Sequence, residues 1–337
     1  MGKVPPKSLI KVFARHLGVP TDRLISGPAI GEDAAIIDMG DRVLVLATDP
    51  ITAAIENVGW LSVHINANDI ATCGAKPLWY LCSILLPEKA NEELFEVIMR
   101  QVDRAARELD VSVIGGHSEV TLGLNRSIII GFMVGEAAKD KYVSSSGARP
   151  GDEVILTKQA GIEGTAILAT DLAKILRGKI GGETLESARN FIRKISVVKE
   201  AMIAVDVGGI DAMHDPTEGG LINGLWELAE ASRVGITVYE EKIPIAYETK
   251  SICKALNIDP LQVMGSGALL IVVKSNKVNN VAFALQSEGI MTSVIGKVTR
   301  LENGRRMIKG NGSSIELAPP EQDHVYKVLE EFSIKSL

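Results

Sequence analysis

Residues 57–77 read NVGWLSVHINANDIATCGAKP and carry the strongest fold signal in the chain. Their apolar residues make a wall about four helical turns long, which predicts a largely buried helix. Polar side chains interrupt this wall at His64, Asn66, Asn68 and Asp69. Burying an unpaired carboxylate costs several kcal/mol, so Asp69 needs a hydrogen-bond partner, a counter-charge or a metal ion. The alternative is that Asp69 only accepts bonds from backbone amides or caps a neighbouring loop.

The composition is typical of a folded protein with a sizeable core. The 337 residues are enough for one large or two ordinary domains, 46% of them are hydrophobic, and the mean hydropathy is +0.18. The net charge of −6 and the pI near 5.6 argue against broad binding to nucleic acid or anionic membranes. A local basic pocket for a phosphate is still compatible with this charge. We therefore expect neither a nucleic-acid nor a membrane partner.

Cysteine usage and the N-terminal sequence indicate a reducing compartment. Cys73, Cys82 and Cys253 form no CxxC pair, so neither a disulfide framework nor a cysteine-based zinc site is expected. Cys73 and Cys82 are typical of small core residues. The N-terminus lacks a continuous apolar signal segment, and no run reaches 18 apolar residues. These features predict a soluble, cytoplasmic protein.

Hydrophobic periodicity and turn residues predict two α+β layered domains. In the first half we expect helices at 8–17, 57–77 and 91–109, and strands at 34–38, 42–47, 78–86, 111–114 and 127–134. In the second half we expect strands at 153–157, 210–213, 236–239, 268–273 and 292–298, and helices at 165–176, 186–194, 197–205, 221–232, 278–288 and 321–332. The turn-rich stretch 139–152 predicts the boundary between domains 1–145 and 146–337.

Acidic residues recur at the ends of predicted strands or inside apolar elements. They are Asp33, Asp49, Asp69, Glu119 and Asp215. Converging carboxylates repel one another unless cations neutralise them. Mg²⁺ prefers oxygen ligands and bridges phosphates, so the set indicates a magnesium site. Each acid alone is more typical of a turn or a helix cap, and spacing in the sequence does not establish that they converge.

Two glycine-rich openings precede predicted helices. They are Gly161–Gly164 and Thr217–Gly220. The first amides of a helix are free and carry a partial positive charge, which suits a phosphate group. Neither opening matches a P-loop or a dinucleotide fingerprint. The alternative for either one is plain helix capping.

Five motifs, taken together, carry a resemblance to a known family. They are GEDAA at 31–35, ATD at 47–49, NDIATCGAKP at 68–77, GGHSE at 115–119 and DPTEGG at 215–220. The set, in this order, resembles the PurM-like (AIR synthase-related) superfamily, and within it most closely the hydrogenase maturation factor HypE. The resemblance implies a β-rich N-terminal domain that pairs in a homodimer and an α/β C-terminal domain. It also implies ATP bound in a cleft between the domains, with Mg²⁺ held by acids.

The resemblance assigns roles to single positions. Asp33, Asp49 and Asp69 match the acids implied to bind Mg²⁺, and Asp215 matches an acid near the metal and the phosphates. Backbone approach to the nucleotide is implied at Gly115, Gly116, Gly219 and Gly220. His117 stands where several members have an acid, so Glu119 is expected to supply the missing ligand. Asn68 is expected to position phosphate or metal-bound water, and Asn68, His117 and Asp215 form the expected catalytic set.

Departures from the HypE pattern limit what the resemblance implies. HypE is expected to end in a short tail whose terminal cysteine carries the group being converted, whereas this chain ends Ser336–Leu337 and has its last cysteine at Cys253. We therefore expect no reaction on the protein's own C-terminus. His64 and His214 are more typical of hydrogen-bonded structural histidines than of ligands.

The function implied by the resemblance is ATP-dependent phosphoryl transfer to a small oxygen-bearing acceptor. Two alternatives belong to other classes of protein. The first is an ATP-binding maturation partner that docks onto another protein and has little or no catalysis of its own. The second is a structural subunit with a degenerate site, against which the retained acids argue.

Overall fold

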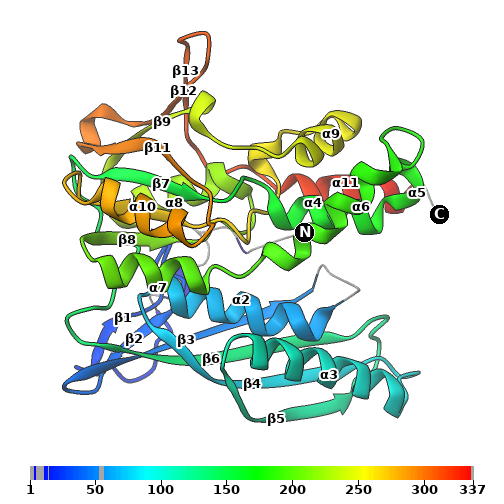
Figure 1. The fold of residues 1–337 in the computed structure, drawn as a ribbon. Helices are drawn as coiled ribbons and strands as arrows, with labels where there is room; N and C mark the ends of the chain where they lie inside the picture. The colour runs from blue at the N-terminus through cyan, green and yellow to red at the C-terminus, as the bar shows by residue number, and fades with distance from the viewer. Residues whose placement is uncertain (1–3, 5–10, 14, 53–56, 335–337) are drawn as a thin grey trace. The chain divides into compact units, whose positions relative to one another are not determined.

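The computed structural model describes Val4 and residues 11–13, 15–52 and 57–334 (Figure 1). The chain folds into two compact units. The N-terminal unit comprises Thr21–Gly27 and Asp33–Tyr142, and the C-terminal unit comprises Val143–Leu337 with Pro28–Glu32 and the residues before Thr21. Of the helix predicted at 8–17, residues 11–13 are helical, and the predicted start lies outside the described residues.

A six-stranded mixed sheet forms the N-terminal unit. Its order is β1 (Leu24–Ser26), β2 (Ala35–Asp38), β3 (Arg42–Ile51), β6 (Ile128–Ala138), β4 (Lys76–Leu86) and β5 (Ser112–Val120). Neighbouring strands are antiparallel except β4 and β5, which are parallel. Parallel neighbours need a crossover connection, and α3 (Glu92–Glu108) provides it. The expected β-rich N-terminal half is thus confirmed.

The helix predicted at 57–77 is α2 (Val58–Thr72), and all 15 of its residues are buried. It packs against β3, β4, β6 and α3. The close approach to β6 depends on two glycines. A Cβ atom at Gly131 would lie 2.3 Å from Nδ2 of Asn66, and one at Gly135 would lie 2.3 Å from Cγ2 of Ile70. Because these two glycines have no side chain, the helix α2 can pack closely against the backbone of β6.

One carboxylate on α3 ties that helix to α2. Nε1 of Trp60 donates to Oε2 of Glu108 at 2.8 Å, and Nε2 of His64 lies 3.2 Å from the same oxygen. The rings of Trp60 and His64 have their centroids 3.9 Å apart. At the start of α3, the Asn91 side chain accepts from the Leu94 amide at 3.0 Å, as expected for a helix cap. His64 is therefore hydrogen-bonded within the fold, as predicted for a structural histidine.

Three strand predictions in this unit were wrong in extent, and β1 was not predicted; β6 continues to Ala138, four residues beyond its predicted end at 134. β3 does not end at Ala47 but continues to Ile51, because β6 pairs with it as far as Ile129. Asp49 consequently lies within the ladder, opposite Gly131. The strand predicted as buried at 111–114 instead runs from Ser112 to Val120 and is exposed throughout. β5 is also the last strand of the sheet and pairs with β4 alone, which leaves one of its backbone edges unpaired.

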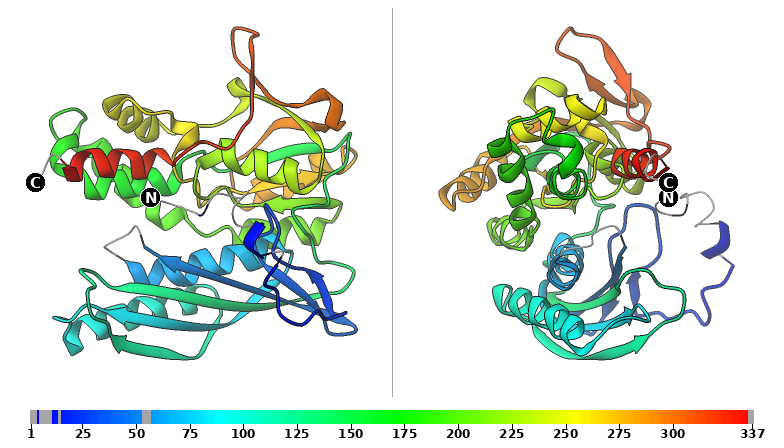
Figure 2. Two further views of the ribbon diagram at one scale, coloured as in Figure 1. Left: turned by 180° about the vertical axis from the view of Figure 1, so that it is seen from behind. Right: turned by 90° about the vertical axis from the view of Figure 1, so that its right-hand side faces the viewer.

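A seven-stranded sheet organises the C-terminal unit (Figure 2). Its order is β13 (Ser314–Glu316), β12 (Arg305–Ile308), β9 (Gly235–Tyr239), β11 (Thr292–Thr299), β7 (Glu153–Thr157), β10 (Leu270–Val273) and β8 (Ile210–His214). The helices are α4 (Ile162–Asp171), α5 (Ala173–Leu176), α6 (Gly182–Arg189), α7 (Val198–Val207), α8 (Gly220–Ala231), α9 (Tyr247–Leu256), α10 (Val278–Ser287) and α11 (His324–Ile334). The α9 helix and the β12–β13 hairpin were not predicted. The mixed two-domain fold class is confirmed.

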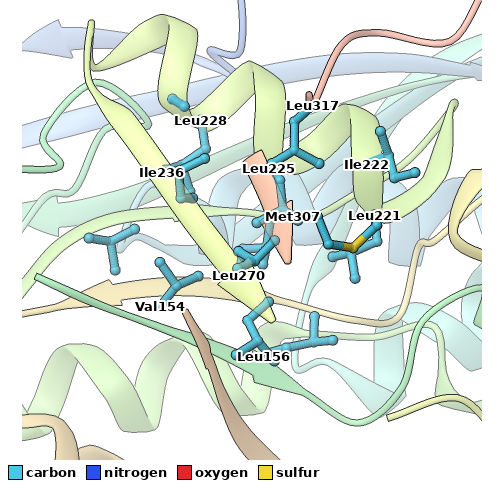
Figure 3. Close-up of a cluster of buried hydrophobic side chains, with 14 of the residues drawn as sticks. Val154, Leu156, Leu221, Ile222, Leu225, Leu228, Ile236, Leu270, Met307 and Leu317 are labelled. Carbon is cyan, nitrogen blue, oxygen red and sulfur yellow. The ribbon is translucent and has the colours of Figure 1, made fainter. Parts of the chain in front are cut away.

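The core of the C-terminal unit lies between α8 and the sheet (Figure 3). Leu221, Leu225 and Leu228 recur at helical spacing on α8 and are fully or almost fully buried. They meet strand side chains such as Leu156 and Ile236. This packing fixes α8, and with it the loop between β8 and α8, against the sheet.

Candidate functional site

Asn66 joins the strand that carries Asp49 to α2. Its Oδ1 accepts from the Asp49 amide at 2.8 Å, and its Nδ2 lies 3.3 Å from the Asp49 carbonyl oxygen. Nδ2 also donates to the carbonyl oxygen of Ser62 at 2.8 Å. Asn66 is fully buried, so these bonds compete with little water. The Asn66 side chain therefore fixes the position of Asp49 relative to α2.

The buried polar pair Asn68–Asp69 follows on the same helix. Asn68 is fully buried and Asp69 is 5% exposed. Asp69 is three residues beyond Asn66, a spacing that places the two side chains within one turn of each other. Because Asn66 holds Asp49, two of the predicted acids, Asp49 and Asp69, are brought to the same part of the N-terminal unit. Sequence reasoning noted Asn66 as a polar residue of this helix and gave it no role, while the role predicted for Asn68, positioning phosphate or metal-bound water, stays a prediction.

The GED segment passes from one unit to the other. Gly31 and Glu32 belong to the C-terminal unit, and Asp33 belongs to the N-terminal unit. Gly31 has φ +75°, and a Cβ there would lie 2.8 Å from the Glu227 carbonyl oxygen on α8. Glycine is required at this position both by the backbone conformation and by the approach to α8. Asp33 itself is half-buried and lies just before β2.

The GGHSE motif lies within β5 rather than after it. A Cβ at Gly116 would lie 2.2 Å from the Cys82 carbonyl oxygen, so this glycine is required by the pairing of β5 with β4. A Cβ at Gly115 would lie 3.7 Å from Cδ2 of Leu81, an ordinary van der Waals contact.

His117 and Glu119 lie on one face of β5. Nε2 of His117 is 3.2 Å from Oε2 of Glu119, and the Thr121 hydroxyl donates to Oε1 of Glu119 at 2.9 Å. The bonds from Thr121 and His117 lower the pKa of Glu119, in that order of size. Both His117 and Glu119 are exposed, so Glu119 is available as an ionised ligand on the surface of the edge strand.

Asp215 lies directly after β8 and is fully buried. Its neighbour His214 is also buried, with Nε2 3.1 Å from Oε2 of Glu227 on α8. This contact ties the end of β8 to α8, so His214 has the structural role that was predicted for it. The loop that carries Asp215 is thereby held at both ends.

In the glycine turn before α8, residues 217–220, two backbone amides already donate hydrogen bonds to acceptors of the protein itself. The Gly220 amide donates to the Thr217 carbonyl oxygen at 3.1 Å. The Gly219 amide donates to Oδ2 of Asp323 at 2.7 Å, from a residue 104 positions further along the chain. Sequence reasoning missed Asp323, although an aspartate just before a mostly apolar helical segment such as 325–329 is a typical helix cap.

The Asp323 carboxylate lies between the first turns of α8 and α11. Its Oδ1 accepts from the Val325 amide at 2.7 Å, and the residue is 4% exposed. Burial raises the pKa of Asp323 to about 7; the two amide bonds oppose this, and the charges of Glu163 and Glu218 add to it. Near neutral pH this carboxyl group therefore exchanges between its charged and neutral forms.

The second glycine opening is used for packing. The Gly164 amide donates to the Met264 carbonyl oxygen at 2.9 Å. A Cβ at Gly161, which has φ +71°, would lie 2.7 Å from Cγ2 of Val263. These contacts favour the capping interpretation for this opening.

Of the five predicted acids, only Asp215 belongs to the C-terminal unit. Within the described ranges, no three His, Cys, Asp or Glu side chains form a group that could hold a metal ion. The magnesium site and the catalytic set therefore stay predictions. The helices of the described chain include none with the length and apolar character needed to cross a membrane. Cys73, Cys82 and Cys253 are buried and form no disulfide, and burial was expected for Cys73 and Cys82.

Several known proteins are similar in sequence to this chain over most of its length. The relatives include a putative hydrogenase expression/formation protein of Methanocaldococcus jannaschii, 30% identical over 310 residues, 90% of each chain. They include a carbamoyl dehydratase HypE of Bradyrhizobium diazoefficiens, 30% identical over 77% of this chain and 75% of that protein. A thiamine-monophosphate kinase of Pyrococcus horikoshii is 28% identical over 89% of this chain and 95% of that protein.

Solved structures share the fold along almost the whole chain. A HypE–HypF complex matches with a TM-score of 0.75 at 24% identity, covering 92% of this chain and 98% of that one. HypE in complex with ATP matches with a TM-score of 0.73 at 24% identity, covering 96% and 97%.

Two family models match the sequence itself. The N-terminal domain of AIR synthase related protein matches residues 31–137, and the C-terminal domain of AIR synthase related protein matches residues 149–309. The two matches together span most of the chain, and they confirm the resemblance inferred from the motifs. The chain therefore belongs to the AIR synthase related protein family.

Proposed function

We propose that this protein is an ATP-binding enzyme of the HypE-like type, which uses Mg²⁺ and transfers a phosphoryl group to a small oxygen-bearing acceptor. The observation that carries the proposal is the Asn66 link, which brings Asp49 to the part of α2 that holds Asp69. Family membership supports it, because one solved HypE structure contains ATP and another relative is a thiamine-monophosphate kinase.

The chemical type of the proposed ligands suits magnesium. The proposed ligands are Asp33, Asp49, Asp69, Glu119 and Asp215, and carboxylate oxygens are the ligands that Mg²⁺ prefers. Bound Mg²⁺ would supply neutralisation of the phosphate charge.

The remaining residues of the proposed site position the nucleotide and the acceptor. Backbone amides at Gly115, Gly116, Gly219 and Gly220 are the proposed contacts to the nucleotide. Asn68, His117 and Asp215 are the proposed groups that orient the acceptor and the transferred phosphoryl group. Phosphoryl transfer asks little covalent chemistry of a protein, so rigid placement of these groups accounts for catalysis.

Replacing Asp69 by Asn tests the proposal. The change keeps the shape of the side chain and removes its charge, so Mg²⁺-dependent binding of ATP should fall at least tenfold in a calorimetric titration. Asp110→Asn is the matched control, because Asp110 is exposed and belongs to the same unit. The control should bind ATP as the unmodified protein does. An unchanged affinity in Asp69→Asn would refute the assignment.

A second function is favoured by the solved HypE–HypF complex. In this alternative the protein binds ATP, docks onto a partner protein during maturation and turns over little by itself. A sensitive ATPase assay separates the two functions. An enzyme hydrolyses ATP or phosphorylates an acceptor without a partner, whereas a maturation protein shows turnover only when the partner protein is added.

We also propose that the protein forms a homodimer in the cytoplasm through β5. All nine residues of β5 are exposed, including Ile114 at 55% and Val120 at 58%, and one edge of the strand is left without a neighbour in the sheet. Exposed apolar edge strands are templates for pairing with another chain. Ile114→Lys should convert the dimer to a monomer in light scattering, with little change in folding. A monomeric unmodified protein, or an unaffected dimer, would contradict this.

A further inference from the structure

The N-terminus of α8 holds an internal anion. Oδ2 of Asp323 accepts from the Gly219 amide at 2.7 Å, where a phosphate oxygen would accept from the same group. α8 has 12 residues, enough for a developed N-terminal partial charge. A carboxylate and a phosphate therefore compete for one donor, and only one of them can have it at a time.

The charged form of Asp323 is poorly stabilised in this position. The side chain is 4% exposed, and burial raises its pKa to about 7. The acids that face it are Glu163 on α4 and Glu218 in the glycine turn, and both disfavour a second negative charge. Glu163 is engaged by the Ser266 hydroxyl at 2.5 Å, and Glu218 by the Tyr326 hydroxyl at 3.1 Å. The charged form of Asp323 is thus held at the Gly219 amide at a cost in desolvation and in repulsion from these two acids.

The same contacts anchor the first turn of α11. Besides Asp323, the Tyr326 hydroxyl reaches Glu218 in the glycine turn, and Nδ1 of His324 accepts from the Asp259 amide at 3.1 Å. Val325 packs against Gly164, where a Cβ would lie 2.9 Å from its Cγ2. Two of these four contacts are made with the glycine turn, so a ligand at Gly219 would remove one directly and disturb the other.

We propose that Asp323 is an internal substitute for ligand phosphate at the N-terminus of α8, and that a phosphate binding at Gly219 displaces it and loosens the first turn of α11. The inference rests on the proposed function, because it takes a nucleotide phosphate as the competing anion. The first turn of α11 would then become less ordered when nucleotide binds, and the Asp323 contact would weaken nucleotide binding. Removal of Asp323 should therefore strengthen phosphate binding, whereas removal of a positioning residue would weaken it.

The test compares Asp323→Ser with the unmodified protein. A serine hydroxyl still accepts from the Val325 amide and caps α11, but it carries no charge and cannot also reach Gly219. Asp323→Asn is the second variant, which keeps the shape, and Glu321→Gln is the control, which removes an exposed charge two residues away. Urea unfolding first establishes which variants are folded. Calorimetry then measures affinity for Mg²⁺-ATP and for tripolyphosphate, each at pH 7.5.

The expected result is at least threefold tighter binding of both probes in Asp323→Ser and unchanged binding in Glu321→Gln. In the unmodified protein, ATP should increase hydrogen–deuterium exchange in a peptide covering residues 320–330, a readout that needs no variant. If ATP binds but affinity does not rise in the folded variants and exchange does not increase, the displacement is wrong while the proposed function stands. If ATP binds to no form but tripolyphosphate binds more tightly to Asp323→Ser, the proposed function fails and the displacement stands. If neither probe binds, both fail.

Discussion

Asn66→Asp is expected to lower the free energy of unfolding at pH 7 by roughly 3–5 kcal/mol. The substitution changes one atom type, Nδ2 to oxygen, at a side chain with no exposure. Nδ2 donates to the carbonyl oxygens of Ser62 and Asp49. An oxygen in its place cannot donate a hydrogen bond and would lie against these two oxygens, which are also acceptors. A buried carboxylate without a donor adds the cost of desolvation.

Chemical unfolding of this variant can be followed by fluorescence of Trp60 and Trp79 in the N-terminal unit, after Trp226 in the C-terminal unit is replaced by Phe. Asn91→Asp is the control, because Asn91 is an exposed helix cap where aspartate serves equally well. The deficit should shrink as the pH falls from 7 towards about 4, because burial among acceptors raises the pKa of the introduced carboxyl group above its unfolded value, and the protonated group can donate one bond. A deficit under about 1 kcal/mol, or one that grows as the pH falls, would contradict the role of Asn66.

The second large effect is expected in the C-terminal unit, from Glu200→Gln. Nζ of Lys158 lies 2.6 Å from Oε1 of Glu200, and it also donates to the carbonyl oxygens of Lys194 and Ser196, at 2.9 and 2.6 Å. Both members of the ion pair are largely buried. Removing the charge of Glu200 leaves a buried ammonium without its counter-charge, which typically costs about 3–5 kcal/mol.

The pH dependence of this variant has a definite sign. Burial lowers the pKa of Lys158, and Glu200 opposes that lowering. A lysine whose pKa is lower in the folded protein has a cost that is fully present below the folded pKa and is relieved as the pH rises towards 10.5. Losing Glu200 lowers the pKa further, so the deficit should shrink between neutral pH and pH 10. Unfolding titrations at pH 7 and pH 9.5, with Glu241→Gln as an exposed control, measure this. A deficit that is constant or larger at pH 9.5 would rule it out.

Local pattern was enough for most elements of the fold. The apolar run at 57–77 predicted α2, and Asn91 with the periodic run behind it predicted α3 within one residue at each end. Strand β7 was predicted with its observed bounds. In these segments the propensity of the residues and the burial that the fold imposes point the same way.

Predictions of strand length and burial failed where these depend on segments that are distant in the sequence. The sequence 111–120 contains apolar residues that suit a buried strand, yet β5 is exposed throughout and lies at the edge of the sheet. β3 is longer than its apolar run because β6 continues to pair with it. Neither fact is encoded near the residues that it affects.

The candidate site, like the fold, was predicted from the sequence only in part. The amino-acid sequence alone determined which residue types are present: carboxylates at 33, 49, 69, 119 and 215, glycines that permit close backbone approach, and a polar interruption of α2. Only the tertiary structure decided that Asn66 holds the backbone of Asp49, since that depends on which face of α2 meets β3. It also decided that Asp323 reaches Gly219 across 104 residues. Hydrogen bonds are formed by proximity in space, and periodicity along a chain reports only which face a residue shares with its near neighbours.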